Sequence, residues 1–396
     1  MTKSRRNFLA AAGLALPVVA SATRSEEPQQ TPSPAPARPQ NPVKAFATPQ
    51  FTYRTLGKTG LKVTTVGFGC MITSDGSVVE RAADLGITYF DTARSYGSGN
   101  NERMVGAALK RKRKDLVLST KTEANNKEGA LAQLDTSLKE LGTDFVDIWY
   151  LHGKTRPADV NDGLVEAQQI AKKAGKIRFA GVSTHSGQKE LIPWMTTNPN
   201  IDVILTQYNF SMEPFMNEVI EAAAKAGKGI VAMKVMAGGT RRAQPGNPTF
   251  EKLSRDGALV AALKWVIKNP NVGTTVPSMT DMDQLEENLR AGAQAFSPSD
   301  EKILAMHLDR IKPFYCRMCG ECEGQCRQGL PVADVLRFLT YADGYGQFQL
   351  GRERFLGMEE KHTSVKCDSC PGCTVECPYG VRVAERLIKA QELFAC

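Results

Sequence analysis

The sequence predicts an α/β fold, a closed (β/α)8 TIM barrel followed by a smaller α-rich module. Apolar runs typical of buried parallel strands alternate with helix-period segments in eight successive units. Polar residues end several of these runs at nearly equal spacing, and most of the ten cysteines gather near the C-terminus. A chain of 396 residues with 42% hydrophobic content has room for a barrel of roughly 250 residues and a further module.

The polar strand-end residues are Asp91, Lys121, His152 and Ser183, which follow one another at intervals of 30, 31 and 31 residues. A strand, a crossover helix and their loops together take about 30 residues. Each residue is therefore predicted at the same end of a successive βα unit, which in a closed barrel is the catalytic face. Tyr96 lies in the loop after Asp91, so a phenol is expected near a carboxylate.

The remaining elements follow in order. Residues 53–63 alternate polar and apolar positions around glycines, which predicts a hairpin that plugs the bottom of the barrel, and 63–69 is the expected first barrel strand. Helices are expected at 76–85, 101–112, 128–141, 160–174, 187–196, 213–226, 257–268 and 282–293, with strands between them. A helix at 299–311 would link this barrel, 51–298, to a module at 299–396.

The first 22 residues have the pattern of an export signal. Arg5 and Arg6 form a twin-arginine pair within Ser-Arg-Arg-Asn-Phe-Leu-Ala, an apolar run reaches Val19, and small residues end at Ala22. We expect a twin-arginine signal that is cleaved near Ala22 and directs the protein to the periplasm or another extracytoplasmic space. The alternative is a frayed basic N-terminus.

Residues 23–50 are rich in proline and polar residues, which predicts a semi-extended linker. The formal net charge of +8 becomes +5 once Lys3, Arg5 and Arg6 are removed. The basic run 110–114 could suggest nucleic acid, but cations at the end of a helix favour its dipole, so no nucleic-acid partner is expected. No apolar stretch is long enough for a transmembrane segment.

Motifs on the predicted barrel resemble those of the aldo-keto reductase family. They are Tyr-Arg-Thr-Leu-Gly-Lys-Thr-Gly-Leu at 53–61, Phe-Asp-Thr-Ala-Arg-Ser-Tyr-Gly at 90–97, Gly-Val-Ser at 181–183, the strand-end Lys121 and His152, and Glu287-Asn288. The resemblance covers about 51–294. It implies an oxidoreductase that uses NADP(H) or NAD(H) on a small carbonyl or alcohol substrate, with Asp91, Tyr96, Lys121 and His152 as catalytic tetrad.

The chemistry explains these residue types. Hydride addition to a carbonyl builds negative charge on oxygen, so an acid must deliver a proton, and Tyr96 is the candidate. A free phenol has a pKa of about 10, and a nearby Lys121 ammonium is expected to lower it. Asp91 would orient the lysine, and His152 would hydrogen-bond the substrate oxygen. Taken singly, a core histidine and a structural Asp–Lys ion pair are the alternatives.

The resemblance also implies cofactor contacts. Ser183 and Gln207 would grip the nicotinamide carboxamide, although Thr184 replaces the usual Asn and the run 231–235 lacks the stacking aromatic residue. Gly238 and Gly239 would let the backbone approach a pyrophosphate, unless their loop is an ordinary turn. The remaining expected contacts are Ser278, Glu287 and Asn288, with Arg241, Arg242 or Arg290 as candidate phosphate ligands.

Eight of the ten cysteines form two copies of C-x2-C-x2-C-x3-C. This spacing is typical of two-cluster ferredoxins, in which the fourth cysteine of each set reaches the other cluster. It predicts two [4Fe-4S] clusters in a ferredoxin-like module. One would be held by Cys316, Cys319, Cys322 and Cys377, and the other by Cys367, Cys370, Cys373 and Cys326.

Zinc and disulfides are the alternatives for these cysteines. Zinc usually takes two C-x2-C pairs, which leaves the third cysteine of each set unexplained. Disulfides suit exported proteins but not such close ladders, and export of a prefolded chain would protect assembled clusters. Arg327 stands where ferredoxins usually have proline. Cys70 is expected in the core, and Cys396 has no assigned role.

Two functions remain open from sequence alone. The first is an exported oxidoreductase in which clusters carry single electrons and the barrel carries hydride, with a redox protein as possible partner. The second is an electron-transfer or binding protein that keeps the barrel only as a scaffold. Substrate identity, the direction of reaction and oligomeric state have no readable signature.

Overall fold

Eight parallel strands form one closed sheet. The computed structural model describes residues 50–212, 214–238 and 257–395, and within them the strand order is β10-β9-β8-β7-β6-β5-β4-β3. A parallel bridge between Val66, just before β3, and Thr275 of β10 joins the two ends of the sheet. The predicted (β/α)8 barrel is confirmed.

The strands are short and almost entirely buried. Their bounds are β3 (Phe68–Gly69), β4 (Tyr89–Asp91), β5 (Val117–Thr122), β6 (Val146–Leu151), β7 (Ile177–Thr184), β8 (Val203–Gln207), β9 (Gly229–Met233) and β10 (Thr274–Thr275). Asp91 pairs with Ser119, and Lys121 pairs with Tyr150. Because all eight strands run in one direction, their C-terminal ends meet on one face.

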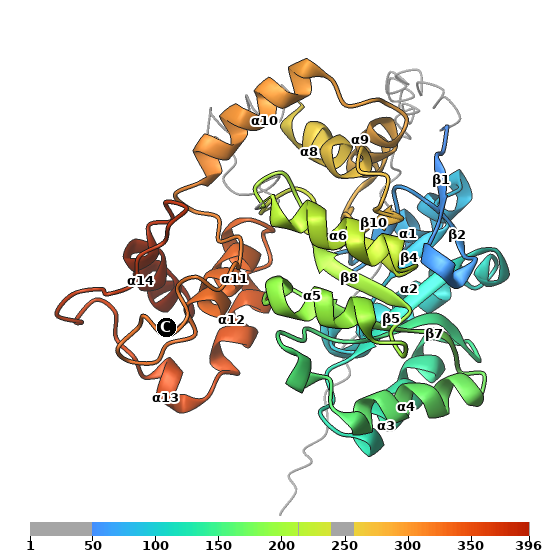
Figure 1. Cartoon of the computed structure of the whole chain (residues 1–396), viewed down its shortest axis with the longest axis horizontal. Helices are drawn as coiled ribbons and strands as arrows, with labels where there is room; N and C mark the ends of the chain where they lie inside the picture. The colour runs from blue at the N-terminus through green and yellow to red at the C-terminus, as the bar shows by residue number, and fades with distance from the viewer. Residues whose placement is uncertain (1–49, 213, 239–256, 396) are drawn as a thin grey trace, which may run out of the picture. The chain divides into compact units, whose positions relative to one another are not determined.

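Helices follow the strands as the hydrophobic period predicts. They are α1 (Gly76–Leu85), α2 (Asn100–Leu109), α3 (Lys127–Leu141), α4 (Asp162–Lys173), α5 (Gln188–Thr197), α6 (Phe215–Lys225), α8 (Ala258–Ile267) and α9 (Met282–Gly292) (Figure 1). Side-chain caps set several starts: Asn126 accepts from Gly129 N, and Asn161 accepts from Leu164 N. Most predicted bounds agree to within two residues.

The predicted helix 101–112 ends three residues too late. α2 ends at Leu109, and the basic run continues into a 3-10 turn, Arg113–Asp115. Arg111 and Lys112 pair with Glu80 and Asp84 of α1. Arg113 pairs with Asp147 at 3.0 Å. Carboxylates of the barrel therefore neutralise much of this run.

A hairpin precedes the barrel. Strands β1 (Tyr53–Thr55) and β2 (Lys62–Thr64) pair antiparallel, and the fully buried Leu56 between them packs in the barrel core. Residues 62–64 thus belong to the hairpin, so the predicted first strand 63–69 begins too early. The Thr64 hydroxyl donates to Val66 O at 2.8 Å, which turns the chain before β3 begins.

Helices α10 (Pro298–Ile311), α11 (Val332–Asp343), α12 (Phe348–Leu356), α13 (Glu360–Thr363) and α14 (Val383–Phe394) follow the barrel. The last four gather in orange and red in Figure 1, and α11, α12 and α14 share a core that includes Phe355 and Phe394. Helix α12 was not predicted from the sequence. A Cβ at Gly351 would lie 2.6 Å from Phe338 O, so this glycine permits close packing.

We call residues 312–395 the tail. Barrel and tail belong to one compact unit. In the described ranges, no helix is long and apolar enough to cross a membrane. Some predictions concern residues outside the described ranges. These residues are the expected signal 1–22, positions 23–49 of the expected linker, and Gly239, Arg241, Arg242 and Cys396. Cys70 is fully buried, as expected.

Candidate active site

Three of the four expected catalytic side chains form a hydrogen-bonded row. Lys121 Nζ, at the end of β5, lies 2.5 Å from Asp91 Oδ2 and 3.4 Å from Tyr96 Oη. It also donates to Thr92 O at 2.7 Å, while Ser119 Oγ donates to the other Asp91 oxygen at 2.7 Å. Lys121 and Asp91 are almost completely buried. The lysine is thus held between a carboxylate and a phenol.

The loop that carries Tyr96 is anchored from below. Arg94 Nη1 pairs with the fully buried Glu102 at 2.6 Å, and Thr120 of β5 donates to the same carboxylate at 2.6 Å. Gly99 has φ +90°, and a Cβ there would lie 1.4 Å from an Arg94 nitrogen. Only glycine therefore lets Arg94 reach Glu102 beneath the loop.

The environment of Tyr96 differs from the sequence expectation. We expected the Lys121 ammonium to lower the pKa of this phenol. Burial is instead the largest effect and raises the pKa of Tyr96 well above its usual range, and the charge of Asp91 acts in the same direction. The phenol therefore stays protonated at neutral pH and is available as a proton donor.

His152 lies across from Tyr96, with the two rings edge to face and their centroids 5.9 Å apart. Its Nδ1 is 3.3 Å from Glu123 Oε1. Burial, then the charges of Lys121 and Arg354, lower the pKa of His152 well below its usual range. The imidazole is therefore neutral, and the contact with Glu123 is no ion pair.

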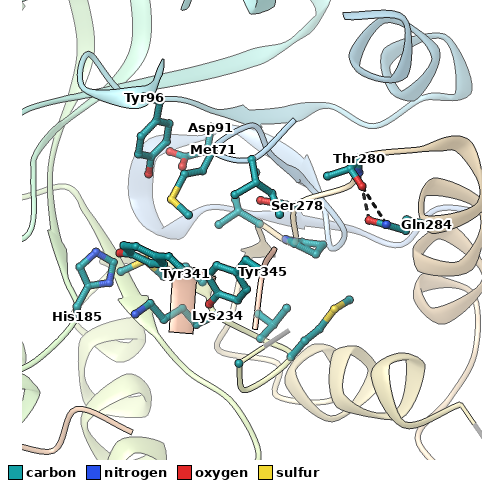
Figure 2. Close-up of a pocket in the computed structure, with 18 residues that line it drawn as sticks. Met71, Asp91, Tyr96, His185, Lys234, Ser278, Thr280, Gln284, Tyr341 and Tyr345 are labelled. Atoms are coloured by element: carbon teal, nitrogen blue, oxygen red, sulfur yellow. Dashed lines mark hydrogen bonds between the residues drawn. The ribbon is translucent and has the colours of Figure 1, made fainter. Parts of the chain in front are cut away.

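Asp91 and Tyr96 line a cavity of about 970 Å³, its mouth included. Asp91, Tyr96 and Met71 lie at one side, and Ser278, Thr280 and Gln284 lie at another (Figure 2). Tyr341 and Tyr345, from the end of α11 and just after it, form a further wall with His185 and Lys234. The two tyrosine rings stack at 5.8 Å and 29°. The tail thus supplies part of the cavity wall.

Sequence reasoning missed His185, Lys234, Tyr341 and Tyr345. Lys234 directly follows β9, so its strand-end position was a usable signal. Its backbone has φ +54°, an uncommon conformation for a residue other than glycine. Burial, then the charge of Arg337, lower the pKa of Lys234 to about 7. The tyrosines carried no such signal, because they come from a distant helix.

The two expected carboxamide ligands have partners within the chain. Ser183 Oγ, near the end of β7, accepts from Gly153 N at 2.9 Å. The amide of Gln207, at the end of β8, donates to Tyr315 Oη at 3.1 Å and to Arg317 O at 3.2 Å. The tail residue Tyr315 therefore lies where the resemblance implied a nicotinamide contact.

Of the other expected cofactor residues, some line the cavity and some do not. Gly238 and Ser278 line the cavity. Gly238 has φ +99° and lies against the Tyr315 ring, which a Cβ would approach to 2.9 Å. Glu287 and Asn288 lie on α9 and are absent from the described cavity lining.

Comparison with known proteins agrees with this barrel. The family model described as "Aldo/keto reductase family" matches residues 74–309. The chain belongs to the aldo/keto reductase family. This family member is 28% identical over 304 residues to the uncharacterized oxidoreductase YqkF of Bacillus subtilis, an alignment that covers 66% of the chain and 97% of YqkF.

Solved structures give the same result. An aldo-keto reductase from Bacillus halodurans in its holo form matches with 26% identity and a TM-score of 0.56, covering 65% of this chain and 96% of that one. A Klebsiella pneumoniae aldo/keto reductase in complex with NADP and acetate matches with 20% identity and a TM-score of 0.54, covering 63% and 93%. The latter likeness concerns the fold alone.

The cysteines of this family member fall into two groups of neighbours. Burial, then the charges of Cys322, Cys319 and Cys377, raise the pKa of the Cys316 thiol to about 12. Burial, then the charges of Cys326, Cys373 and Cys370, raise the pKa of Cys367 to about 11. Each group joins three cysteines of one motif to the fourth of the other.

The second group also lines a hollow. Cys326, Cys367, Cys370 and Cys373 surround a cavity of about 450 Å³, open solvent included. In the part of the chain that the structure describes, no three His, Cys, Asp or Glu side chains converge closely enough to hold a single metal ion. The thiols of this second group are therefore neighbours spread around a space.

Proposed function

We propose that this chain reduces a small carbonyl compound, or oxidises the corresponding alcohol, with NADP(H) or NAD(H). The row Asp91–Lys121–Tyr96 at the edge of a large cavity carries this proposal. A nicotinamide bound there supplies the hydride. In the direction of reduction, the carbonyl carbon gains this hydride and the oxygen must gain a proton.

Tyr96 Oη delivers that proton to the developing alkoxide. Its half-buried phenol is protonated at neutral pH, and the nearby Lys121 ammonium stabilises the phenolate that remains. Asp91 holds the lysine in position through their ion pair. The neutral imidazole of His152 can donate one N–H to the same substrate oxygen, which helps to orient the carbonyl.

The proposed cofactor contacts are Ser183, Gln207, Gly238, Gly239, Ser278, Glu287 and Asn288. The cavity supports this set in part, because it extends from Tyr96 to Gly238 and Ser278. The Klebsiella pneumoniae neighbour was solved in complex with NADP, which favours NADP(H) as the first nucleotide to try. A titration showing equal affinity for NADH and NADPH would speak against a preference.

The Tyr96→Phe variant tests the proposal. Loss of the general acid should lower the rate of NADPH-dependent reduction across a panel of aldehydes and ketones by about 10²- to 10⁴-fold. Tyr53→Phe is the matched control, since Tyr53 is an exposed residue of the hairpin. Near-normal turnover by Tyr96→Phe with an unchanged circular dichroism spectrum would exclude Tyr96 as the acid.

We also propose that residues 299–396 form a linking helix and a ferredoxin-like module with two [4Fe-4S] clusters, which carry single electrons. Cys316, Cys319, Cys322 and Cys377 would hold one cluster. Cys367, Cys370, Cys373 and Cys326 would hold the other. The grouping of the thiols supports this assignment, and the crossed fourth ligand is a feature of two-cluster ferredoxins.

Metal analysis after anaerobic purification tests the clusters. Two cubanes require about eight iron and eight sulfide ions per chain, whereas zinc in place of iron would refute them. Replacing Cys316, Cys319, Cys322 and Cys377 together by serine should leave about four irons in an intact cluster. A second variant, in which Cys316, Cys319, Cys322 and Cys326 are replaced by serine, should damage both clusters. Equal iron contents in the two variants would refute the crossed grouping.

We further propose that residues 1–22 are a twin-arginine signal and that 23–50 tether the exported protein. The sequence pattern alone supports this. Export of an Arg5→Lys, Arg6→Lys variant should fail, so that the protein stays in the cytoplasm with its signal attached. Normal periplasmic recovery of that variant would contradict the proposal. A redox protein in the same compartment is the expected electron partner.

A second function is favoured by one observation. The side-chain amide of Gln207 already donates a hydrogen bond to Tyr315 Oη. This contact suits an electron-transfer or binding protein whose barrel no longer turns over nicotinamide. Denaturing the protein purified from the periplasm and assaying the extract for nicotinamide nucleotide separates the two functions. Nucleotide in the extract supports the reductase, and its absence together with failed NADPH binding supports the scaffold.

A further inference from the structure

Lys234 is an amine on the cavity wall that forms no ion pair with a carboxylate among the described residues, although the charges of Cys316 and Asp334 act on it. Because its pKa is about 7, a bound anion would increase the fraction of this amine that is protonated. Its Nζ contacts Met318 Sδ at 3.5 Å and lies 6.0 Å from the centre of the Tyr341 ring. Thioether and aromatic groups are weak partners for an ammonium. Lys121, in contrast, has Asp91 at 2.5 Å. A partly buried cation with such weak partners is suited to bind an anion.

The segment that carries this lysine has an uncommon backbone conformation. Lys234 and Ala237 both have left-handed φ values, +54° and +43°, in the short segment after β9. Residues other than glycine adopt this conformation mainly where surrounding structure imposes it, often at functional sites. Figure 2 shows the Lys234 amine beside His185 and below Tyr341.

A second polar atom faces the same place. His185 Nδ1 is buried and has no hydrogen-bond partner among the described residues. Its ring lies 6.4 Å from that of His152, which in turn lies 5.9 Å from that of Tyr96. The three rings form a row that leads from the proposed acid to the neighbourhood of Lys234.

We propose that Lys234 binds a carboxylate of the substrate, so that the carbonyl compound reduced at Tyr96 is an acid. The inference rests on the proposed function and adds the substrate class to it. His185 offers a second contact for the carboxylate or for a neighbouring hydroxyl. The stacked Tyr341 and Tyr345 give a flat wall for the carbon skeleton between the two ends.

The cavity suits a carboxylate better than a phosphate, because its described lining offers few basic side chains. Among the described residues that line the cavity, Lys234 is the one lysine or arginine. The nearby Arg337 pairs with Asp334 at 2.8 Å and does not line the cavity. Phosphates are usually bound by several donors, often with arginine forks. The phosphates of the nucleotide are a second possible source of anionic oxygen, so the experiment separates them.

A pair of probes isolates the charge. 4-Carboxybenzaldehyde and methyl 4-formylbenzoate present the same aldehyde on the same ring and differ in a carboxylate or its ester. With the full chain, purified with its metal content intact, we expect kcat/KM to favour the acid by about tenfold or more. Lys234→Met should abolish this preference by raising KM for the acid, with kcat and the ester little changed.

Three controls complete the design. Lys234→Arg keeps the charge on the same backbone and should keep much of the preference for the acid. Lys225→Met removes an exposed lysine of α6 and should change nothing. Calorimetric binding of 4-(hydroxymethyl)benzoate and its methyl ester reads the carboxylate contact without turnover, and Lys234→Met should weaken only binding of the acid.

The outcomes separate the two proposals. If neither aldehyde is reduced but Lys234→Met selectively weakens binding of the acid, the reductase function fails and the carboxylate site stands. If the unaltered protein binds acid and ester equally, the carboxylate site is refuted whatever the turnover. If Lys234→Met weakens NADPH binding and leaves the preference for the acid intact, the lysine serves the nucleotide and the substrate assignment is overturned.

Discussion

Two parts of the barrel rim stabilise buried polar side chains in opposite ways. At the ends of β4 and β5, which we call the self-paired rim, Asp91, Lys121 and Ser119 satisfy one another. At the ends of β8 and β9, the tail-covered rim, Gln207 and Asn209 both donate to Tyr315 Oη of the tail. The first rim is complete within two successive βα units, whereas the second depends on a segment about a hundred residues further along the chain.

This difference separates proton delivery from recognition. The self-paired rim holds the proposed acid and keeps its own charges balanced, so its geometry does not depend on a ligand. The tail-covered rim leaves Lys234 with weak partners, and its wall is shared with Tyr341 and Tyr345. A change in the tail should therefore alter binding more than it alters proton delivery.

Removing the lysine of the self-paired rim gives the largest expected loss of stability. Lys121→Met leaves the buried Asp91 without its cation, which costs about 3 to 5 kcal/mol of unfolding free energy. Urea-induced unfolding measures this. Lys225→Met, which breaks an exposed pair with Glu221, should cost about 0.5 kcal/mol or less. Equal losses in the two variants would show that the self-paired rim is not held by this pair.

Acid should weaken the tail-covered rim through His307 of α10. Its ring packs on Phe210, and burial lowers its pKa from 6.5 to about 4. Below pH 6.5 the unfolded chain binds this proton and the native chain does not, so stability falls as pH drops from about 6.5 to about 4.

The His307→Gln variant isolates this contribution. Each pKa unit corresponds to about 1.4 kcal/mol, so the variant should lose noticeably less unfolding free energy across that window than the unaltered protein. Unfolding by urea at a series of pH values measures both curves. Parallel curves would assign the acid sensitivity to other groups.

Tyr315→Phe tests the contact between tail and barrel. The change removes the oxygen that accepts from Gln207 and Asn209; unsatisfied buried amides cost about 1 to 3 kcal/mol. Tyr208→Phe is the comparison, because the Tyr208 hydroxyl contacts the barrel residues Asn217 and Asn269. It therefore removes a tyrosine hydroxyl and leaves the contacts of Tyr315 between tail and barrel unchanged. If Gln207 also grips a nicotinamide, NADPH should bind Tyr315→Phe more tightly, and unchanged affinity would exclude competition between the two.

The smallest effect is expected where the tail touches the self-paired rim. Arg354 pairs with Glu123 at 3.1 Å, and both side chains are more than a third exposed, so Arg354→Gln should cost about 1 kcal/mol or less. The charge of Arg354 helps to lower the pKa of His152. Its removal should raise that pKa, which NMR titration of the imidazole measures. An unchanged titration would show that the tail does not influence this histidine.

The amino-acid sequence by itself determined the barrel and the self-paired rim. Equal spacing of Asp91, Lys121 and His152 reflects a repeated βα unit, and parallel strands in register bring the ends of neighbouring strands together. The periodicity of each helix is equally local, which explains why most helix bounds could be predicted. The cysteine spacing predicted two sets of cluster ligands, and the charges that act on Cys316 and Cys367 come from the same sets; that these thiols hold clusters stays a prediction.

Only the tertiary structure decided the tail-covered rim and the acidity of Tyr96. Helical periodicity shows that α11 has a buried face, but not that residues beyond it reach the cavity beside Lys234 and His185. The pKa of Tyr96 depends on a balance between burial and neighbouring charges, and burial is set by everything that covers the cavity. Docking of distant segments and desolvation are properties of the folded chain as a whole, so no local pattern encodes them.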